Sequence, residues 1–317
     1  MKVQILWQSK SHSGFTDLIL YKQVWYCVFR EGSTHMSLDG EIIVLTSEDG
    51  ERWLEHSRLT WQGGDLRDPK FSISPDDVLI LSAGIRWAVP NSIASKLYSV
   101  AWTVDENKPA WSSPIMDSTS EGTWRWAMTW HNNYAYSVGY SGLDKHGCLY
   151  RSADGLYWTP LVKPFFPETQ VFTNESTLVS DGNRLVCVSR RDAVGGANAV
   201  LGQSDHDDQM WSWCKLPIAI GGPKLLKLSN GEWVLAVRHI KYKYLTAKTR
   251  LYKLNPENGH VKLWHTLSSS GDCSYAGLVE HESKLYISYY SSHKNEQTNV
   301  FLAVIPLISK KKSQRYS

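Results

Sequence analysis

The sequence lacks any apolar run long enough to cross a membrane as a helix, and no window shows a long 3.6-residue apolar period. It also lacks an excess of one charge, since 34 Lys and Arg oppose 31 Asp and Glu along the chain. We therefore expect few helices and neither a nucleic-acid nor a membrane partner. The first ten residues contain no signal-peptide-like stretch, which favours a cytoplasmic protein, with a secreted form whose leader was removed as the alternative.

Cysteine is scarce, and the five cysteines show no paired spacing. Cys27, Cys187 and Cys273 fall in apolar, strand-like runs, where small buried thiols are expected. The histidines are scattered without the spacing of metal ligands, so we expect neither a metal site nor another cofactor.

Two short segments repeat one pattern about a hundred residues apart. They read Ser47-x-Asp49-Gly50-x-x-Trp53 and Ser152-x-Asp154-Gly155-x-x-Trp158. An Asp-Gly pair favours a tight turn, because the Asp side chain accepts hydrogen bonds from the turn and Gly adopts positive φ without strain. The repeat therefore indicates the fold rather than a function. We expect its copies to lie on outer turns, away from any functional site.

Weaker copies of the pattern extend it along the chain. Their tryptophans continue a series that recurs every 47 to 58 residues: Trp53, Trp111, Trp158, Trp211 and Trp264. The interval is close to that of one four-stranded propeller blade. Short alternating or apolar runs closed by turn residues support the same architecture. The sequence thus predicts an all-β, six-bladed β-propeller made of four-stranded antiparallel blades.

The blades are predicted at residues 15–60, 64–115, 122–163, 172–218, 222–268 and 273–308. The last blade is one strand short, and a ring that does not close leaves an exposed edge. We expect the strand at residues 3–7 to supply the missing outer strand. Residues 1–309 are then a single domain, and residues 310–317, which include the basic run 310–312, form a polar, disordered tail.

A six-bladed propeller with these Asp-box repeats resembles the sialidase superfamily. The run Asn174-Glu175-Ser176, followed by a strand ending at Arg190, is similar to the segment that supplies a sialidase's Glu and one carboxylate-binding Arg. The run from Asp272 to Leu278 resembles the segment with the nucleophilic Tyr, which is Tyr275 here. Arg238 stands near the position of a further carboxylate-binding Arg.

The resemblance implies an exo-glycoside hydrolase acting on a terminal, acidic sugar. A phenol relieved of its proton by Glu175 can attack an anomeric carbon that bears a carboxylate, whereas a carboxylate nucleophile would be repelled. Arginine suits such a substrate because its guanidinium binds both carboxylate oxygens in one plane.

Two positions depart from the sialidase pattern. Where that family has Arg-Ile-Pro, this chain has Phe15-Thr16-Asp17, so the first Arg is absent. The loop at residues 31–41, where the general acid is expected, offers His35 and Asp39. The catalytic candidates are Tyr275, Glu175, Asp39 and Asp68. The substrate-binding candidates, which begin or end inner strands or lie in that loop, are Arg190, Arg238, Arg30, Arg67, Arg125, Asp17 and His35.

Simpler interpretations stay open. Glu175 with Arg190, or Arg67 with Asp68, would also suit a structural ion pair, and Tyr275 a packing aromatic. A non-catalytic propeller would bind a glycan or a protein at the same place. A third possibility is a glycosidase that uses a carboxylate pair, such as Asp17 and Asp68, on a neutral sugar. We expect a carbohydrate ligand and a monomeric protein.

Overall fold

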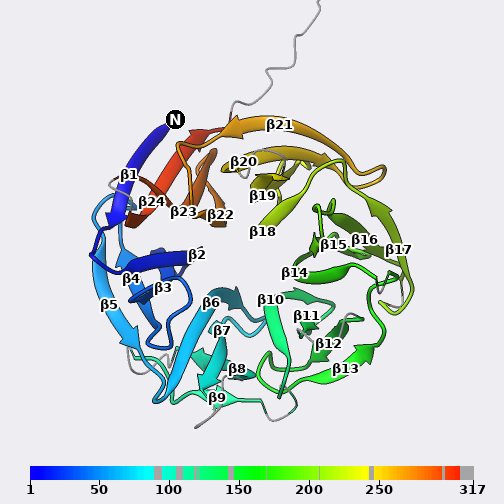
Figure 1. The fold of residues 1–317 in the computed structure, drawn as a ribbon, viewed down its shortest axis with the longest axis horizontal. Coiled ribbons are helices and arrows are strands. Elements are labelled where there is room, and N and C mark those ends of the chain that lie inside the picture. Colours follow the sequence, from blue (N-terminus) through cyan, green and yellow to red (C-terminus); the bar gives the residue numbers. More distant parts are fainter. Residues whose placement is uncertain are drawn as a thin grey trace, which may run out of the picture.

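Six four-stranded antiparallel sheets form a closed ring (Figure 1). The structure is a computed structural model that describes residues 1–88, 95–104, 110–117, 119, 121–141, 146–168, 170–206, 208–242, 246–294 and 297–307. These residues contain no helix with the length and apolar character needed to span a membrane. The six-bladed prediction is confirmed. The proposed tail at 310–317 lies outside the described residues.

The blades follow the chain in order, and the first strand of each lies nearest the centre of the ring (Figure 1). Blades one and two consist of β2 (His12–Tyr21), β3 (Val24–Gly32), β4 (Glu41–Ser47) and β5 (Leu54–Leu59), then β6 (Gly64–Ile73), β7 (Leu79–Ala88), β8 (Ser95–Thr103) and β9 (Ile115–Met116). Blades three and four consist of β10 (Trp124–His131), β11 (Tyr134–Tyr140), β12 (Cys148–Ser152) and β13 (Thr159–Val162), then β14 (Phe172–Ser180), β15 (Leu185–Asp192), β16 (Val200–Ser204) and β17 (Trp211–Lys215). Blade five consists of β18 (Ile220–Lys227), β19 (Trp233–Lys241), β20 (Thr246–Asn255) and β21 (His260–Thr266), and blade six begins with β22 (Cys273–His281), β23 (Lys284–Lys294) and β24 (Gln297–Pro306).

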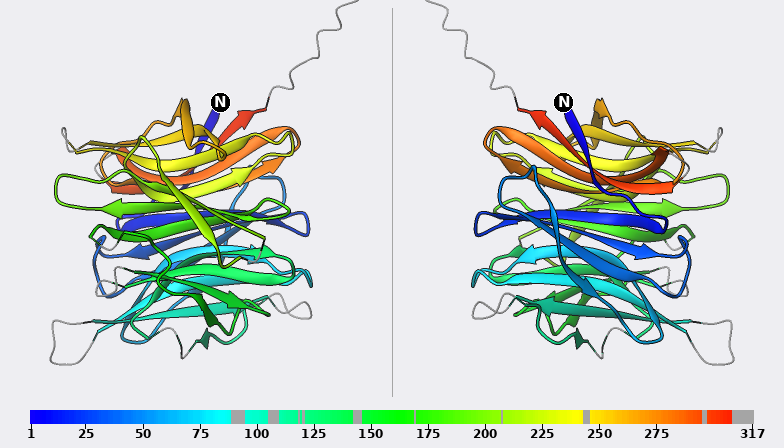
Figure 2. Two further views of the ribbon diagram at one scale, coloured as in Figure 1. Left: turned by 90° about the vertical axis from the view of Figure 1, so that its right-hand side faces the viewer. Right: turned by 90° about the vertical axis from the view of Figure 1, so that its left-hand side faces the viewer.

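The N-terminal strand β1 (Lys2–Trp7) closes the ring. It pairs antiparallel with β24 and becomes the outer strand of blade six, as the missing strand in the sequence predicted. Figure 2 shows β1 lying beside β24 from both sides of the ring. The first and last strands of the chain thus share one sheet, in which β1 pairs with the otherwise unpaired edge of β24.

The repeated turns, which we define as residues 47–53 and 152–158, join the third and fourth strands of blades one and three. In both turns, the Ser hydroxyl accepts a hydrogen bond of 2.9 Å from the Gly backbone amide. The pairs are Ser47 with Gly50 and Ser152 with Gly155. The Asp carboxylate accepts two further backbone amides in each turn. Asp105, part of a weaker copy, lies outside the described residues.

Apolar side chains fill the spaces between neighbouring blades. One such cluster joins Val28 and Val44 of blade one to Leu66 and Ile85 of blade two, all fully buried. The thiols of Cys27, Cys187 and Cys273 are buried, as expected. Burial on both faces explains why the strands read as apolar runs rather than strict alternations.

Each of the six innermost strands contains one β-bulge near its start. The bulge places Phe15, Asp68 and Tyr275 in the left-handed region, with φ of 60°, 50° and 48°. Bulges redirect side chains, and non-glycine residues adopt such φ values at a cost in free energy. The repeated bulge therefore positions side chains toward the centre of the ring at one end.

Candidate active site at the centre of the ring

Tyr275 and Glu175 meet across the ring, although a hundred residues separate them. The Tyr275 hydroxyl donates to Glu175 Oε1 at 2.7 Å. Both side chains are largely buried, with 5% of Tyr275 and 8% of Glu175 exposed. Burial, and then the charge of Glu175, raises the pKa of Tyr275 well above its usual value. The phenol is therefore protonated and has a base in contact with it.

Gly222, at the bulge of β18, fixes both members of this pair. Its backbone amide donates to Glu175 Oε2 at 2.6 Å. A Cβ atom at this position would stand 2.6 Å from Cγ of the Tyr275 ring, and φ is +52°. Glycine is therefore required here for close approach of the ring as well as for the backbone. Gly222 was not among the predicted site residues, although the run Gly221-Gly222-Pro223 is a visible signal of an unusual backbone.

Arg190, at the end of β15, contacts both members of the pair. Its Nη1 donates to Glu175 Oε1 at 2.9 Å and to the Tyr275 hydroxyl at 3.2 Å, while Nε donates to Asp192 Oδ1 at 3.1 Å. Burial alone would lower its pKa, but the carboxylates of Glu175 and Asp192 raise it overall. Arg190 thus stays charged beside the phenol oxygen.

Two further guanidiniums surround Tyr275. Arg238, from β19, lies over the Tyr275 ring at 4.8 Å from its centroid. Arg67, from β6, lies 4.8 Å over the Phe15 ring, which itself contacts the Tyr275 ring at a centroid distance of 5.1 Å. Each arginine also has a carboxylate partner, Asp272 for Arg238 and Asp65 for Arg67. The structure therefore brings Arg67, Arg190 and Arg238 together. The Arg that the sialidase pattern has in blade one is absent here, and Arg67 belongs to blade two.

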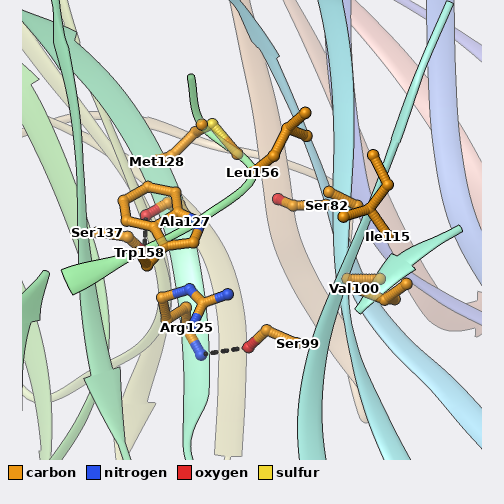
Figure 3. Close-up of a pocket in the computed structure, with 13 residues that line it drawn as sticks. Ser82, Ser99, Val100, Ile115, Arg125, Ala127, Met128, Ser137, Leu156 and Trp158 are labelled. Carbon is orange, nitrogen blue, oxygen red and sulfur yellow. Dashed lines mark hydrogen bonds between the residues drawn. The ribbon is translucent and has the colours of Figure 1, made fainter. Parts of the chain in front are cut away.

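Arg30 and Arg125 do not join this group, which corrects the expectation for both. Arg30 pairs with Asp65 at 2.6 Å, and neither side chain is exposed. Arg125 pairs with Asp117 at 3.0 Å and lies 5.1 Å over the Trp158 ring. A cavity of about 20 Å³ lies beside it between blades two and three (Figure 3). Both arginines hold blades together.

Four side chains are candidates for the general acid, Asp17, His35, Asp39 and Asp68, and they occupy different environments. Asp17 accepts the Phe71 amide at 2.9 Å and the Lys224 ammonium at 2.8 Å, so its oxygens bind the protein itself. Asp39 is exposed, and its oxygens accept the Ser33 backbone amide at 3.1 and 3.2 Å. The carboxylate oxygens of Asp17 and Asp39 are thus bound to donors of the protein itself.

Asp68 is the candidate whose protonation suits an acid. It is 7% exposed, and its Oδ1 has no hydrogen-bond partner among the described residues. Burial raises its pKa to about 6, although Arg67 and Lys70 oppose the rise. The charge of Glu175 also raises the pKa of Asp68, and both carboxylates raise the pKa of Tyr275. The three side chains are therefore close enough to influence one another's protonation.

Aromatic rings line the centre around these charges. Phe15, Trp126, Tyr275 and Tyr290 form one buried cluster, in which the Trp126 and Tyr275 rings are 5.6 Å apart. Lys70 Nζ lies 5.1 Å over the Trp126 ring and donates to Thr16 O at 3.1 Å. Burial lowers the pKa of this lysine. The low-polarity walls strengthen every charge interaction among the site residues.

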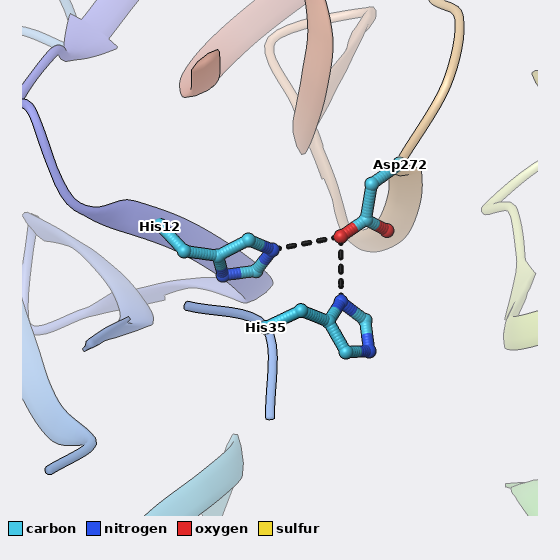
Figure 4. A group of neighbouring side chains, drawn as sticks. All are labelled: His12, His35 and Asp272. Atoms are coloured by element: carbon cyan, nitrogen blue, oxygen red, sulfur yellow. Dashed lines mark hydrogen bonds and ion pairs between the residues drawn. The ribbon is translucent and has the colours of Figure 1, made fainter. Parts of the chain in front are cut away.

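His35 lies at the edge of the site, in a group that the sequence did not predict. His12 Nε2 and His35 Nδ1 approach the same oxygen of Asp272, Oδ2, at 2.7 and 2.6 Å (Figure 4). Oδ1 of Asp272 accepts Arg238 at 2.6 Å and the Tyr290 hydroxyl at 2.7 Å. Burial would raise the pKa of Asp272, but its hydrogen bonds with both histidines and the charge of Arg238 hold it well below the usual range.

Solved structures with this fold include glycoside hydrolases. A protein of unknown function from Dyadobacter fermentans is 16% identical, with a TM-score of 0.83 over 97% of this chain and 98% of that one. Trypanosoma rangeli sialidase is 12% identical, with a TM-score of 0.67 over 92% of this chain and 54% of that one. The α-L-arabinofuranosidase from Fusarium graminearum is 13% identical, with a TM-score of 0.69 over 93% of each chain. No family model and no curated protein matches the sequence. The chain thus has the propeller fold of sialidases and related glycosidases.

Proposed function

We propose that this protein hydrolyses a terminal glycoside, with Tyr275 as the nucleophile and Glu175 as its base. The observation that carries the proposal is the 2.7 Å hydrogen bond from the Tyr275 hydroxyl to Glu175, with Arg190 contacting both. Covalent catalysis requires a nucleophile that donates a hydrogen bond to a base, and a third group that orients the base. Tyr275, Glu175 and Arg190 have these positions. The sialidases and the arabinofuranosidase of the same fold support glycoside hydrolysis as the reaction class.

The first half of the reaction transfers the glycosyl group to Tyr275. Because the phenol is protonated, Glu175 takes the proton as the phenol oxygen bonds to the anomeric carbon. The bond from that carbon to the leaving oxygen breaks, and an acid protonates the leaving oxygen. Water then attacks the glycosyl-tyrosine and gives a proton to the acid, which was ionised in the first half, while Glu175 returns its proton to the phenol oxygen. Arg190 stabilises the negative charge that develops between Tyr275 and Glu175.

Asp68 is the proton donor in this proposal. A carboxyl with a pKa of about 6 is still largely protonated in mildly acidic solution, unlike an ordinary Asp. Activity should therefore decline as the pH rises through about 6, because ionised Asp68 has no proton to donate.

The preferred substrate carries a carboxylate. Arg67, Arg190 and Arg238 each bind a protein carboxylate through part of the guanidinium, and one Nη of each has no hydrogen-bond partner among the described residues. Three such donors around the nucleophile suit an anionic group on the sugar. A phenol nucleophile suits the same substrate, because it is uncharged as it approaches.

A neutral sugar is the second candidate. It is favoured by the carboxylate partners of all three arginines, which already compensate their charge. The arabinofuranosidase of the same fold takes its name from a sugar without a carboxylate. In a non-catalytic propeller, the contact between Tyr275 and Glu175 would be a structural hydrogen bond.

A matched panel of aryl glycosides tests these alternatives. We expect phenol release from an aryl sialoside or uronide, and at least about 100-fold slower release from aryl galactoside and arabinofuranoside. Arg67→Gln should raise KM for the acidic substrate by about tenfold or more, since a charged hydrogen bond is lost. Arg184→Gln, in an exposed ion pair with Glu257, is the matched control and should leave KM unchanged.

The outcome of the panel distinguishes an acidic from a neutral substrate, and an enzyme from a binding propeller. Faster release from a neutral glycoside would replace the acidic-sugar assignment with the neutral one. No release from any glycoside, by a folded protein that still binds a sugar, would overturn the enzyme assignment in favour of a binding propeller.

A further inference from the structure

Three metal-ligating side chains from distant parts of the chain converge at the edge of the site. We call His12, His35 and Asp272 the rim triplet. One ligand atom of each, His12 Nε2, His35 Nδ1 and an Asp272 oxygen, lies within 4.8 Å of the other two. His12 begins β2, His35 lies in the loop between β3 and β4, and Asp272 precedes β22, so blades one and six supply the triplet (Figure 4).

The triplet has the composition of a transition-metal site. Two imidazoles and one carboxylate form a common three-ligand set for zinc and similar divalent ions, which leaves further coordination positions open. Carboxylates that bind metals are themselves held by hydrogen bonds, and here Arg238 and Tyr290 hold Oδ1 of Asp272. Oδ2 therefore turns toward the two histidines.

Burial differs across the triplet in a way that suits ion access. The His12 side chain is 11% exposed and the Asp272 side chain 25%, whereas the His35 side chain is 40% exposed. His12 is held between aromatic rings, with Phe15 and Tyr290 each at a centroid distance of 5.9 Å. Two ligands are thus fixed by their surroundings, and the third lies on the solvent side.

We propose that His12 Nε2, His35 Nδ1 and Asp272 Oδ2 bind a divalent transition-metal ion, with Zn²⁺ the best match to the donor set. The proposal rests on the triplet's own geometry and does not depend on the proposed reaction. A metal bound here joins the loop of blade one to blade six. It also presents an open position beside Phe15, whose ring contacts both His35 and Tyr275 at 5.1 Å.

Metal binding needs only a small rearrangement. The ligand atoms now stand 2.6 and 2.7 Å apart, as hydrogen-bonded groups do. Around a tetrahedral Zn²⁺ with bonds of about 2.0 to 2.2 Å, they would stand about 3.3 Å apart. Each imidazole must present an unprotonated nitrogen to the ion, so a proton on His12 Nε2 or His35 Nδ1 must leave that atom when the metal binds. Arg238 opposes the ion by its charge, and it also fixes the carboxylate that binds the ion.

The test measures metal binding directly. The whole protein is stripped with a chelator, and Zn²⁺ affinity is then measured by competition with a chromophoric chelator. The visible absorption of Co²⁺ is measured in parallel. We expect one ion per chain, with affinity reduced at least about tenfold in both His35→Ala and His12→Ala. His260→Ala, at an exposed histidine of β21, is the matched control and should bind as the unchanged protein does.

His35→Ala decides the question even where a buried His12 variant fails to fold, because His35 is partly exposed in a loop. Retained one-to-one affinity and an unchanged Co²⁺ spectrum in His35→Ala would overturn the proposal. Failure of the unchanged protein to bind either ion would overturn it as well. Neither result would bear on glycoside hydrolysis, which the aryl glycoside panel tests separately.

Discussion

The repeated turns and the centre of the ring use repetition in opposite ways. In the turns at residues 47–53 and 152–158, the same side chains make the same hydrogen bonds. At the centre, all six innermost strands share a bulge, but the side chains at the bulges differ, among them Phe15, Asp68 and Tyr275. One region repeats its sequence, and the other repeats only its backbone.

This difference separates stability from chemistry. A turn that closes the outer strands of a blade can keep one sequence where it recurs, because its hydrogen bonds lie within the turn itself. The centre of a ring is a single place that the blades share, so each blade must contribute a different group. Variants of the two regions should therefore fail in different ways: loss of unfolding free energy in the turns, and loss of turnover at the centre.

The largest expected effect is on turnover at the centre. Tyr275→Phe removes the nucleophilic oxygen and keeps the ring that packs on Phe15 and Trp126. We expect kcat on the best aryl glycoside to fall by at least about 10⁴-fold, equivalent to about 5 kcal/mol of transition-state stabilisation. Thermal unfolding should show an intact fold. Tyr157→Phe, at an exposed ring in a repeated turn, is the control and should keep full activity.

A turn variant should show the reverse. Trp158 is 4% exposed and packs against Arg125 between blades two and three. Trp158→Ala should lower the free energy of unfolding by about 3 to 5 kcal/mol, through lost burial and the cavity left behind. Denaturant titration measures this loss. A Trp158→Ala protein that stays fully stable but loses turnover would contradict the separation of the two regions.

A third variant, Asp68→Asn, should change both the free energy of unfolding and the turnover. The folded pKa of about 6 lies above the ordinary value of 3.8, so the folded state binds the proton more tightly than the unfolded one. The unchanged protein must then lose stability as the pH rises from about 4 to above 6. Asp68→Asn has no such loss, and at pH 8 it should be more stable by up to about 3 kcal/mol.

Unfolding measured at pH 4 and pH 8 checks this sign, since the gain should vanish at pH 4. The same variant should lose turnover, because an amide cannot donate the proton that Asp68 supplies. Equal stability of the two proteins at pH 8 would show that Asp68 is not a buried, strained carboxylate.

The smallest expected effect is in the turn itself. Asp154 accepts hydrogen bonds from the amides of Leu156 and Tyr157 at 2.8 and 2.9 Å, and the residue is exposed. Asp154→Ala should lower the free energy of unfolding by about 1 kcal/mol, because those amides can bind water instead. Activity should not change. A loss as large as that for Trp158→Ala would mean that the carboxylate, rather than the ring, holds the turn.

The ring itself was predictable from the sequence, because each blade is a local unit. The tryptophan series set the number of blades, and the shortfall of one strand near the C-terminus predicted the place of β1. Both signals depend on neighbours in sequence, which is why they survive without knowledge of tertiary contacts. The meeting of Tyr275 with Glu175 followed once their strands were assigned to blades six and four.

The remaining parts of the site depend on contacts that no local pattern encodes. His12 and Asp272 are 260 residues apart, and neither has the spacing of a metal motif. Arg30 and Arg67 occupy strands of adjacent blades and share Asp65, yet only Arg67 reaches the aromatic rings. Arg125 lies at the bulge of β10 and pairs with Asp117, a contact that no local pattern in the sequence indicates.

The most direct measurement of the central claim is a search for a sugar bound covalently to Tyr275. An activated glycosyl fluoride, carrying a second fluorine that slows hydrolysis of the intermediate, is added to the protein, and peptides are mapped by mass spectrometry. The account predicts one added glycosyl group on the peptide that contains Tyr275, and none in Tyr275→Phe. A glycosyl group on Asp68 or Glu175, from a protein that turns over the same sugar, would contradict it.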